Sequence, residues 1–257
     1  MDLLLDYHIA DDYKSSSQKA RVITEDWVTR NLYCPICGEP IINHYEANRP
    51  VADFFCDKCK SDFELKSKEN KRGLLGNKIV DGAYDTMIER ITSLRNPNFF
   101  FMTYANFHVC NFILIPNYFF TPHIIEKRNP LSENARRAGW RGCNINISNI
   151  PQSGKIFIVR NGEEINHQKV IETYKQTTSL KTDNLDSRGW LIDVLQCVDK
   201  MPGEEFKLSD IYSFENELKV KHPSNNFVKD KIRQQLQYLR DKGFIEFSSR
   251  GSYRKIH

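Results

Sequence analysis

The spacing of apolar residues predicts several amphipathic helices. Val22, Trp27 and Val28 fall on one face of a helix that we expect from about Gln18 to Asn31, with Ser17 as its N-cap. Further helices are expected near residues 82–94, 167–177, 190–198, 208–218 and 226–242.

Extended segments are predicted between these helices. Continuous apolar runs at residues 98–104, 108–115 and 155–159 are typical of buried strands. Residues 63–67 alternate instead, which places Glu64 and Lys66 on one face of a strand and Leu65 on the other. Residues 68–78 are expected to form a loop, and residues 121–154 show no clear periodicity.

The pattern changes after the polar segment 181–187, KTDNLDS, which is typical of a linker. Beyond it we expect three short helices, the last ended by Gly243, and a hairpin around Arg250-Gly251. This order describes a winged helix. The predicted architecture is therefore an α/β mixed-sheet domain at 1–180, a linker at 181–187, and a small α+β winged-helix domain at 188–257.

Composition narrows the class of protein. The chain has 257 residues, is 40% hydrophobic, and holds no apolar run of the roughly 18 residues that a membrane helix needs. Its acidic amino terminus does not resemble a signal peptide. Seven cysteines, an odd number, favour a reducing, cytoplasmic setting over a disulfide framework. The net charge of +4 permits nucleic-acid binding without requiring it, although from Lys229 onward eight Lys/Arg face three Asp/Glu.

Two Cys-x-x-Cys pairs lie eighteen residues apart. The four thiols belong to Cys34, Cys37, Cys56 and Cys59, a spacing that suits a tetrahedral four-cysteine zinc site. A closed site of this kind leaves no position for a substrate, so we interpret it as structural zinc. Free structural cysteines or a redox pair are the alternatives, and His44 could replace one ligand in principle.

A second pattern is interleaved with the cysteines. Pro50-x-x-Asp53 is followed, after ten residues, by Glu64-Leu65-Lys66. Two carboxylates and the carbonyl of Leu65 can hold a hard cation such as Mg²⁺, and Lys66 can orient or deprotonate a water beside it. The alternative is an exposed acidic strand with a lysine partner. Because Cys56 and Cys59 lie within the ten residues between Asp53 and Glu64, the zinc would brace the hairpin that carries these two carboxylates.

The segments RPVADFFC and FELKSK resemble the PD-(D/E)xK nucleases. Together with the four cysteines, ARRAGW (135–140), SRGW (187–190) and the terminal winged helix, they resemble the DpnI-type methyl-directed restriction endonucleases across essentially the whole chain. The resemblance implies bacterial, magnesium-dependent cleavage of duplex DNA at GATC containing N6-methyladenine. It also implies Asp53, Glu64 and Lys66 as catalytic residues, with the four cysteines as zinc ligands. The Val-Ala pair before Asp53 departs from the superfamily pattern, at a position without chemistry.

A methyl group on adenine needs an apolar wall. We expect Trp140, flanked by Arg136, Arg137 and Arg141, to face the methylated adenines, with the arginines on phosphates or guanine edges. The alternative is a core Trp140 with exposed arginines. Trp190 is expected in the core.

The helix at 226–242 is expected to enter the major groove by its amino-terminal end. Candidate base-reading side chains there are Asn225, Asn226, Lys229, Arg233 and Gln234. Candidate phosphate contacts at the wing are Arg250, Arg254 and Lys255.

Two rival functions stay open from the sequence. One is a zinc- and winged-helix regulator that does not cleave DNA, and the other is a nuclease of the same fold with another target. We expect a monomer, although the sequence does not reveal the oligomeric state, the number of magnesium ions or the base-specific contacts.

Overall fold

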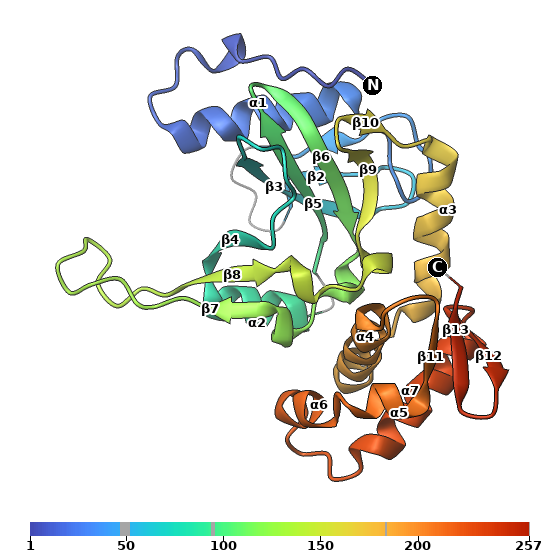
Figure 1. The fold of residues 1–257 in the computed structure, drawn as a ribbon. Helices are drawn as coiled ribbons and strands as arrows, with labels where there is room; N and C mark the ends of the chain where they lie inside the picture. Colours follow the sequence, from blue (N-terminus) through green and yellow to red (C-terminus); the bar gives the residue numbers. More distant parts are fainter. Residues whose placement is uncertain (47–51, 94–95, 183, 257) are drawn as a thin grey trace.

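The computed structural model describes residues 1–46, 52–93, 96–182 and 184–256 (Figure 1). Its α-helices are α1 (Ser16–Asn31), α2 (Tyr84–Thr92), α3 (His167–Thr177), α4 (Leu185–Lys200), α5 (Leu208–Tyr212), α6 (Glu215–Lys221) and α7 (Val228–Asp241). Its strands are β1 (Asn43–His44), β2 (Phe54–Phe55), β3 (Asp62–Glu69), β4 (Lys78–Ala83), β5 (Asn98–Ala105), β6 (His108–Ile115), β7 (Ile125–Lys127), β8 (Gly142–Asn146), β9 (Ile156–Arg160), β10 (Glu163–Glu164), β11 (Glu205–Lys207), β12 (Ile245–Ser249) and β13 (Ser252–Lys255). None of the helices in these ranges has the length and apolar character needed to cross a membrane.

The main sheet has the order β1-β2-β3-β5-β6-β9-β10. It is mixed, because β3 and β5 run parallel while the other neighbours are antiparallel. Its central strands are buried on both faces: Phe99 and Phe101 belong to one core cluster, whereas Phe100 and Met102 belong to the other. This confirms the prediction that the continuous apolar runs are buried strands.

A second sheet, β4-β8-β7, was not predicted. Its β4 precedes α2, so the helix expected from residue 82 begins at Tyr84, and the loop expected at 68–78 is shortened at both ends. The segment 121–154 supplies β7 and β8. Ile145 pairs with Ile79 on one side and with Ile125 on the other, and all three side chains are buried. These strands are too short and too irregular for a period to be visible in the sequence.

Helix α1 covers the outer face of the main sheet (Figure 1). It begins at Ser16, so its N-cap is Ser15, two residues before the predicted one. Trp27 is fully buried, and its indole N–H donates to the carbonyl of Asp2 at 2.7 Å. The fixed orientation of α1 brings its other side chains over β3.

The C-terminal domain combines four helices with the sheet β11-β13-β12. Helix α4 is longer than the predicted helix at 190–198, because the side chain of Asn184 caps it by accepting from the N–H of Ser187 at 2.8 Å. Part of the expected linker is therefore helical. The helix expected at 208–218 is divided into α5 and α6, and β11 adds a strand to the predicted hairpin. Gly243 follows α7 with φ +77°, as a C-cap glycine should.

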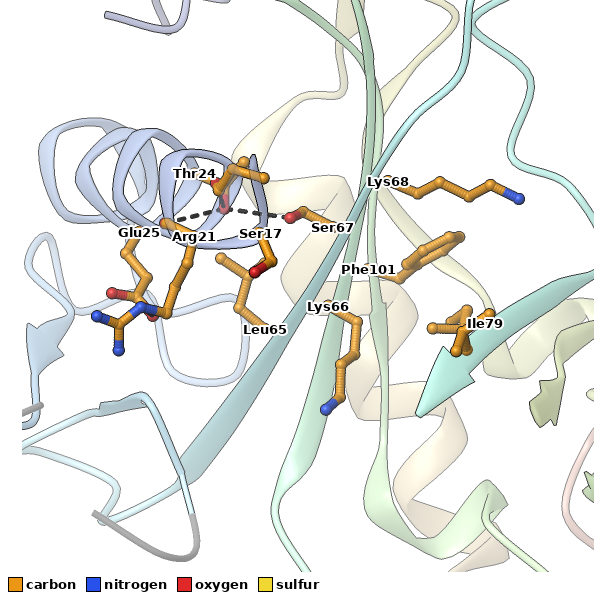
Figure 2. A pocket seen from close by; sticks show the side chains of 12 residues that line it. Ser17, Arg21, Thr24, Glu25, Leu65, Lys66, Ser67, Lys68, Ile79 and Phe101 are labelled. Carbon is orange, nitrogen blue, oxygen red and sulfur yellow. Dashed lines mark hydrogen bonds and ion pairs between the residues drawn. The ribbon is translucent and has the colours of Figure 1, made fainter. Parts of the chain in front are cut away.

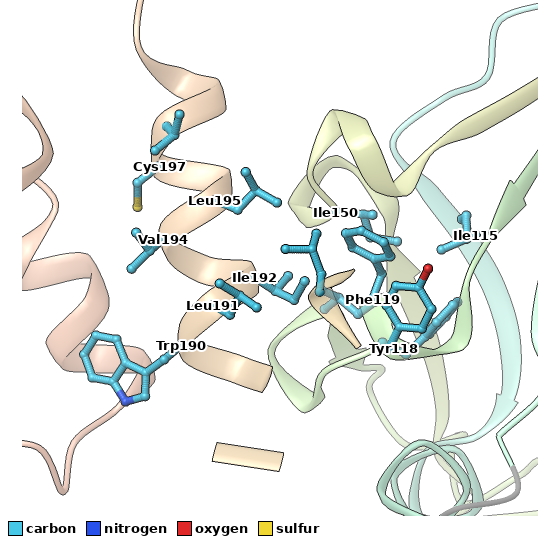
Figure 3. Close-up of a cluster of buried hydrophobic side chains, with 14 of the residues drawn as sticks. Ile115, Tyr118, Phe119, Ile150, Trp190, Leu191, Ile192, Val194, Leu195 and Cys197 are labelled. Carbon is cyan, nitrogen blue, oxygen red and sulfur yellow. The ribbon is translucent and has the colours of Figure 1, made fainter. Parts of the chain in front are cut away.

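Helix α4 joins the two parts of the chain through an apolar contact (Figure 3). Ile192 and Leu195 project from it toward Phe119 and Ile150, within a single continuous buried cluster, while Leu191 lines a pocket with Gln235 and Tyr238 of α7. Trp190, on the same helix, is 1% exposed, which confirms its predicted place in the core. The C-terminal domain is thus packed on the sheet domain.

Candidate functional site

Four thiols converge where the two cysteine pairs meet. The Sγ atoms of Cys34 and Cys59 are 3.6 Å apart, as are those of Cys37 and Cys56, and all four lie within 4.8 Å of one another. Zinc–sulfur bonds of about 2.3 Å in a tetrahedron place the sulfurs roughly 3.8 Å apart. The cluster can therefore hold a metal such as zinc, and its thiolate donors suit that ion.

The second cysteine pair forms the turn between β2 and β3. Phe54 pairs with Phe63 in this hairpin, and the Asp53 N–H donates to the carbonyl of Phe63 at 2.9 Å. The Asp53 carboxylate in turn accepts from the N–H of Leu65 at 2.7 Å. This contact brings Asp53 next to Glu64 in space, as the interleaved motif predicted. Pro50, the first residue of that motif, lies outside the described residues.

Glu64 and Lys66 lie on the same face of β3, in a cluster of alternating charge. The Lys66 ammonium is 2.7 Å from Glu64 Oε1 and 2.7 Å from Asp81 Oδ1, and Arg90 Nη2 is 2.5 Å from Glu64 Oε2. Burial raises the pKa of Glu64 even though both cations lower it. Burial lowers the pKa of Lys66, but the charges of Glu64 and Asp81 outweigh it and raise that pKa, so the ammonium stays protonated.

A further carboxylate approaches from α1. Glu25 is 3.3 Å from His44 Nε2 and 4.0 Å from Arg21 Nε. Burial raises the pKa of Glu25, and the negative charge of Asp53 adds to this rise. Glu25 and Asp53 therefore share one electrostatic environment. His44 contacts Glu25 and is not part of the cysteine cluster.

A pocket of about 350 Å³ opens beside these charges, between α1, β3 and β4 (Figure 2). Arg21 and Glu25 line it from α1, Lys66 and Lys68 from β3, and Ile79 from β4. Thr24 closes one side by a 3.3 Å hydrogen bond to Ser67. Three of the lining side chains, Arg21, Lys66 and Lys68, are cationic, which favours the approach of a negatively charged group such as a phosphate.

Trp140 lies on an arm of residues 128–141 that reaches away from the body between β7 and β8 (Figure 1). Its side chain is half-buried, so it is not a core residue, and the Arg137 guanidinium lies 4.8 Å from the centre of the indole. Arg136 and Arg141 are exposed. A Cβ at Gly142 would lie 2.9 Å from the indole, so the glycine leaves room for the ring.

Some of the predicted DNA-reading side chains of the C-terminal domain are exposed, whereas others already form hydrogen bonds or ion pairs within the domain. Arg233, Gln234 and Arg250 are exposed, although Arg233 also pairs with Asp230. Asn225 instead orders the start of α7, because its side chain accepts from the N–H of Phe227 at 2.7 Å.

Other members of that predicted set have partners within the domain. The Asn226 side chain accepts from Lys219 at 3.1 Å, and Lys229 pairs with Glu215 at 3.2 Å. Arg254 pairs with Glu205 at 2.7 Å and Glu246 at 3.2 Å, and Lys255 donates to the carbonyl of Met201 at the end of α4.

A separate polar cluster bridges the two parts of the chain. Asp193 on α4 accepts from His222 at 2.9 Å and Lys221 at 2.8 Å, and from His123 of the sheet domain at 3.0 Å. The two imidazoles and the carboxylate lie close enough together to hold a metal. Lys221 already neutralises the carboxylate, which favours a structural role for the cluster.

Three residues of the charged cluster were missed from the sequence: Glu25, Asp81 and Arg90. None belongs to a motif, and each reaches β3 from a different element. The one sequence feature that could have indicated β4 is Asp81-Gly82, which follows the short apolar pair Ile79-Val80. Their contribution depends on the packing of α1, β4 and α2 around β3.

Comparison with known families is decisive for this architecture. The model of the Dam-replacing family, DpnI, matches residues 1–183, and the model of the Dam-replacing HTH domain matches residues 186–255. The chain belongs to the DpnI family. Membership in it implies a methylation-dependent restriction enzyme that cleaves DNA and carries a DNA-binding helix-turn-helix domain. The resemblance inferred from the sequence is confirmed, as is the order of a mixed α/β core followed by a small C-terminal domain.

Proposed function

We propose that this DpnI-family protein hydrolyses duplex DNA at GATC sites containing N6-methyladenine, using Mg²⁺ and a PD-(D/E)xK active site. The observation that carries the proposal is the contact of Asp53 with the Leu65 N–H, which holds the Asp53 carboxylate, just before β2, beside Glu64 and Lys66 on β3. The metal-type cysteine cluster at the tip of the same hairpin adds support.

Asp53 and Glu64 are suited to hold Mg²⁺, with the carbonyl of Leu65 as a further ligand. All three donors are oxygens, which is the ligand type that Mg²⁺ prefers. The carboxylates of Asp53, Glu64 and Asp81 outnumber the two cations beside them, Lys66 and Arg90, so the cluster keeps a net negative charge for a divalent ion. When bound, Mg²⁺ would lower the pKa of a water and stabilise the charge that develops on the phosphate.

Lys66 acts as a protonated group in this scheme. Its raised pKa keeps the ammonium charged, so it donates hydrogen bonds to the attacking water or to a phosphate oxygen. Of the two roles open from the sequence, orienting the water therefore fits better than removing its proton. The four cysteines hold structural zinc, which fixes the β2–β3 turn and with it the distance between Asp53 and Glu64.

Recognition of the methyl group is assigned to Trp140. A single methyl in an apolar pocket is worth about 1–3 kcal/mol, or roughly 10- to 200-fold in discrimination. A second reader in the C-terminal domain would multiply this ratio. We assign that role to the amino-terminal end of α7, where Arg233 and Gln234 are exposed and would read bases in the major groove, with Arg250 on phosphate.

The deciding experiment incubates purified protein with matched plasmids, with and without adenine methylation at GATC. Mg²⁺ is omitted in the control instead of being chelated, because a strong chelator would also strip the cysteine cluster. Asp53→Asn is compared with Asp57→Asn, since Asp57 lies exposed on the nearby cysteine turn. We expect magnesium-dependent cutting of the methylated plasmid, abolished only by Asp53→Asn.

Each other outcome removes a defined part of the proposal. Cutting of both plasmids would leave the nuclease and refute methyl dependence. Absence of cutting by folded, zinc-loaded protein would indicate a DNA-binding protein without nuclease activity. Trp140→Ala, compared with Trp140→Phe, tests the methyl reader: loss of preference for methylated DNA is expected only in the alanine variant.

A further inference from the structure

We propose that Asp81 is a positioning residue of the nuclease site, which holds the Lys66 ammonium in place when Glu64 is engaged by the metal. This inference rests on the proposed function. Asp81 belongs to no sequence motif, and it comes from β4 in the second sheet, whereas Glu64 and Lys66 come from β3 in the main sheet.

The contacts of Asp81 fix its carboxylate on Lys66. Asp81 Oδ1 accepts from Lys66 Nζ at 2.7 Å and from the N–H of Gly82 at 2.7 Å. The side chain is 8% exposed. The register of β4 against β8 shifts between Asp81 and Ala83, and an irregularity of this kind re-aims a side chain out of its ordinary direction. The backbone is thus shaped to present this carboxylate to Lys66.

The second carboxylate oxygen points to the same conclusion. Within the part of the chain that the structure describes, Asp81 Oδ2 is buried and has no hydrogen-bond partner. Such an atom is costly to bury, and in native proteins it calls for a specific reason. Lys66 is held by the other oxygen, Oδ1, so Oδ2 stays available to accept from a water at the site.

Glu64 alone is a poor anchor for Lys66. Lys66 Nζ is 2.7 Å from both carboxylates, but Glu64 is also the proposed metal ligand. A divalent ion held by Glu64 would offset the negative charge of this carboxylate and would repel the nearby Lys66 ammonium. Asp81 retains a full countercharge for Lys66, and its amide contact with Gly82 does not depend on the metal. Lys66 therefore stays beside the reacting phosphate.

The test uses Asp81→Asn in the full-length chain, because asparagine can keep the Gly82 contact while losing the charge. Single-turnover cleavage of a methylated GATC duplex is measured beside the affinity for the same duplex without Mg²⁺. We expect the cleavage rate to fall roughly 10- to 100-fold, as displacement of a catalytic group by about 1 Å does, with affinity nearly unchanged. Asp85→Asn, an exposed carboxylate in the first turn of α2, should leave both unchanged.

A double-mutant cycle with Lys66→Ala separates positioning from a general structural effect. If Asp81 acts through Lys66, Asp81→Asn adds little to the loss caused by Lys66→Ala. An additional full loss in that background, or an unchanged rate in the single variant, would overturn the inference. If Asp81→Asn does not fold, Asp81→Glu replaces it in the cycle, since it keeps the charge but shifts it by one methylene. Failure of the unmodified protein to cleave would instead overturn the proposed function.

Discussion

Asp193 is expected to be among the most sensitive polar residues for stability. Its carboxylate is 5% exposed and accepts from three side chains, His123, Lys221 and His222, at 2.8–3.0 Å. Asp193→Asn keeps the shape but leaves the Lys221 ammonium, itself 17% exposed, without its closest countercharge. Removing one partner of a buried ion pair costs about 3–5 kcal/mol. Since Glu217 remains 3.4 Å from Lys221, we expect about 3 kcal/mol.

Urea unfolding followed by circular dichroism measures this loss. The matched control is Asp186→Asn, an exposed carboxylate in the first turn of the same helix, for which only a helix-dipole effect of about 0.3–1 kcal/mol is expected. A loss below about 1 kcal/mol for Asp193→Asn would refute the reasoning, because the bridging cluster would then contribute no more than a surface pair.

The pH dependence gives a second check on Asp193. Burial raises its pKa, but the hydrogen bonds from His123 and His222 and the charge of Lys221 outweigh burial and lower the pKa well below its ordinary value of 3.8. The contribution of a carboxylate with a lowered pKa is complete above its unfolded pKa and is lost as pH falls toward the folded one. The stability difference between wild type and Asp193→Asn should therefore narrow only below about pH 4.

Three further substitutions follow from the structure. Cys56→Ser should remove the bound zinc and lower the melting temperature, and metal analysis showing a full zinc equivalent in this variant would contradict a four-cysteine site. Gly142→Ala should displace the Trp140 indole, which would lie 2.9 Å from the new methyl, and so reduce the preference for methylated DNA in a binding assay; an unchanged preference would exclude Trp140 as the reader. Gly154→Ala should cost about 1–3 kcal/mol in urea unfolding, because its methyl would lie 2.6 Å from the ring of Phe119; an unaffected stability would show that the ring can move away.

The parts of the fold that the sequence predicted are those with strong local signals. The apolar runs that became β5 and β6 are continuous because both faces of these strands are buried. The spacing of the cysteines and of Asp53, Glu64 and Lys66 fixes a hairpin, so the sequence predicted how these groups meet. Both signals are carried by neighbouring residues in one segment.

What the sequence could not predict depends on contacts between distant segments. Strand β4 is short, and Val80 is exposed while Ile79 is buried, so no run marks it as a strand. Asp81 and Arg90 join the site only because β4 and α2 pack beside β3. His123 and Asp193 are 70 residues apart, and nothing in either segment indicates their contact. Asn184 is a good N-cap residue and could have marked the start of α4. The polar composition of residues 181–187 instead suggested a linker.

The apolar contact between α4 and the sheet domain, called the α4 seam below, limits how the protein can be divided into separate domains. Separating the C-terminal domain from the rest would uncover Ile192 and Leu195 on one fragment, and Phe119 and Ile150 on the other. Exposed apolar patches of this kind promote self-association. A chimera that exchanges C-terminal domains between relatives must therefore carry a matching seam, since the linker residues alone do not define a transferable module. The same seam predicts that heat and denaturant unfold both domains in one cooperative transition.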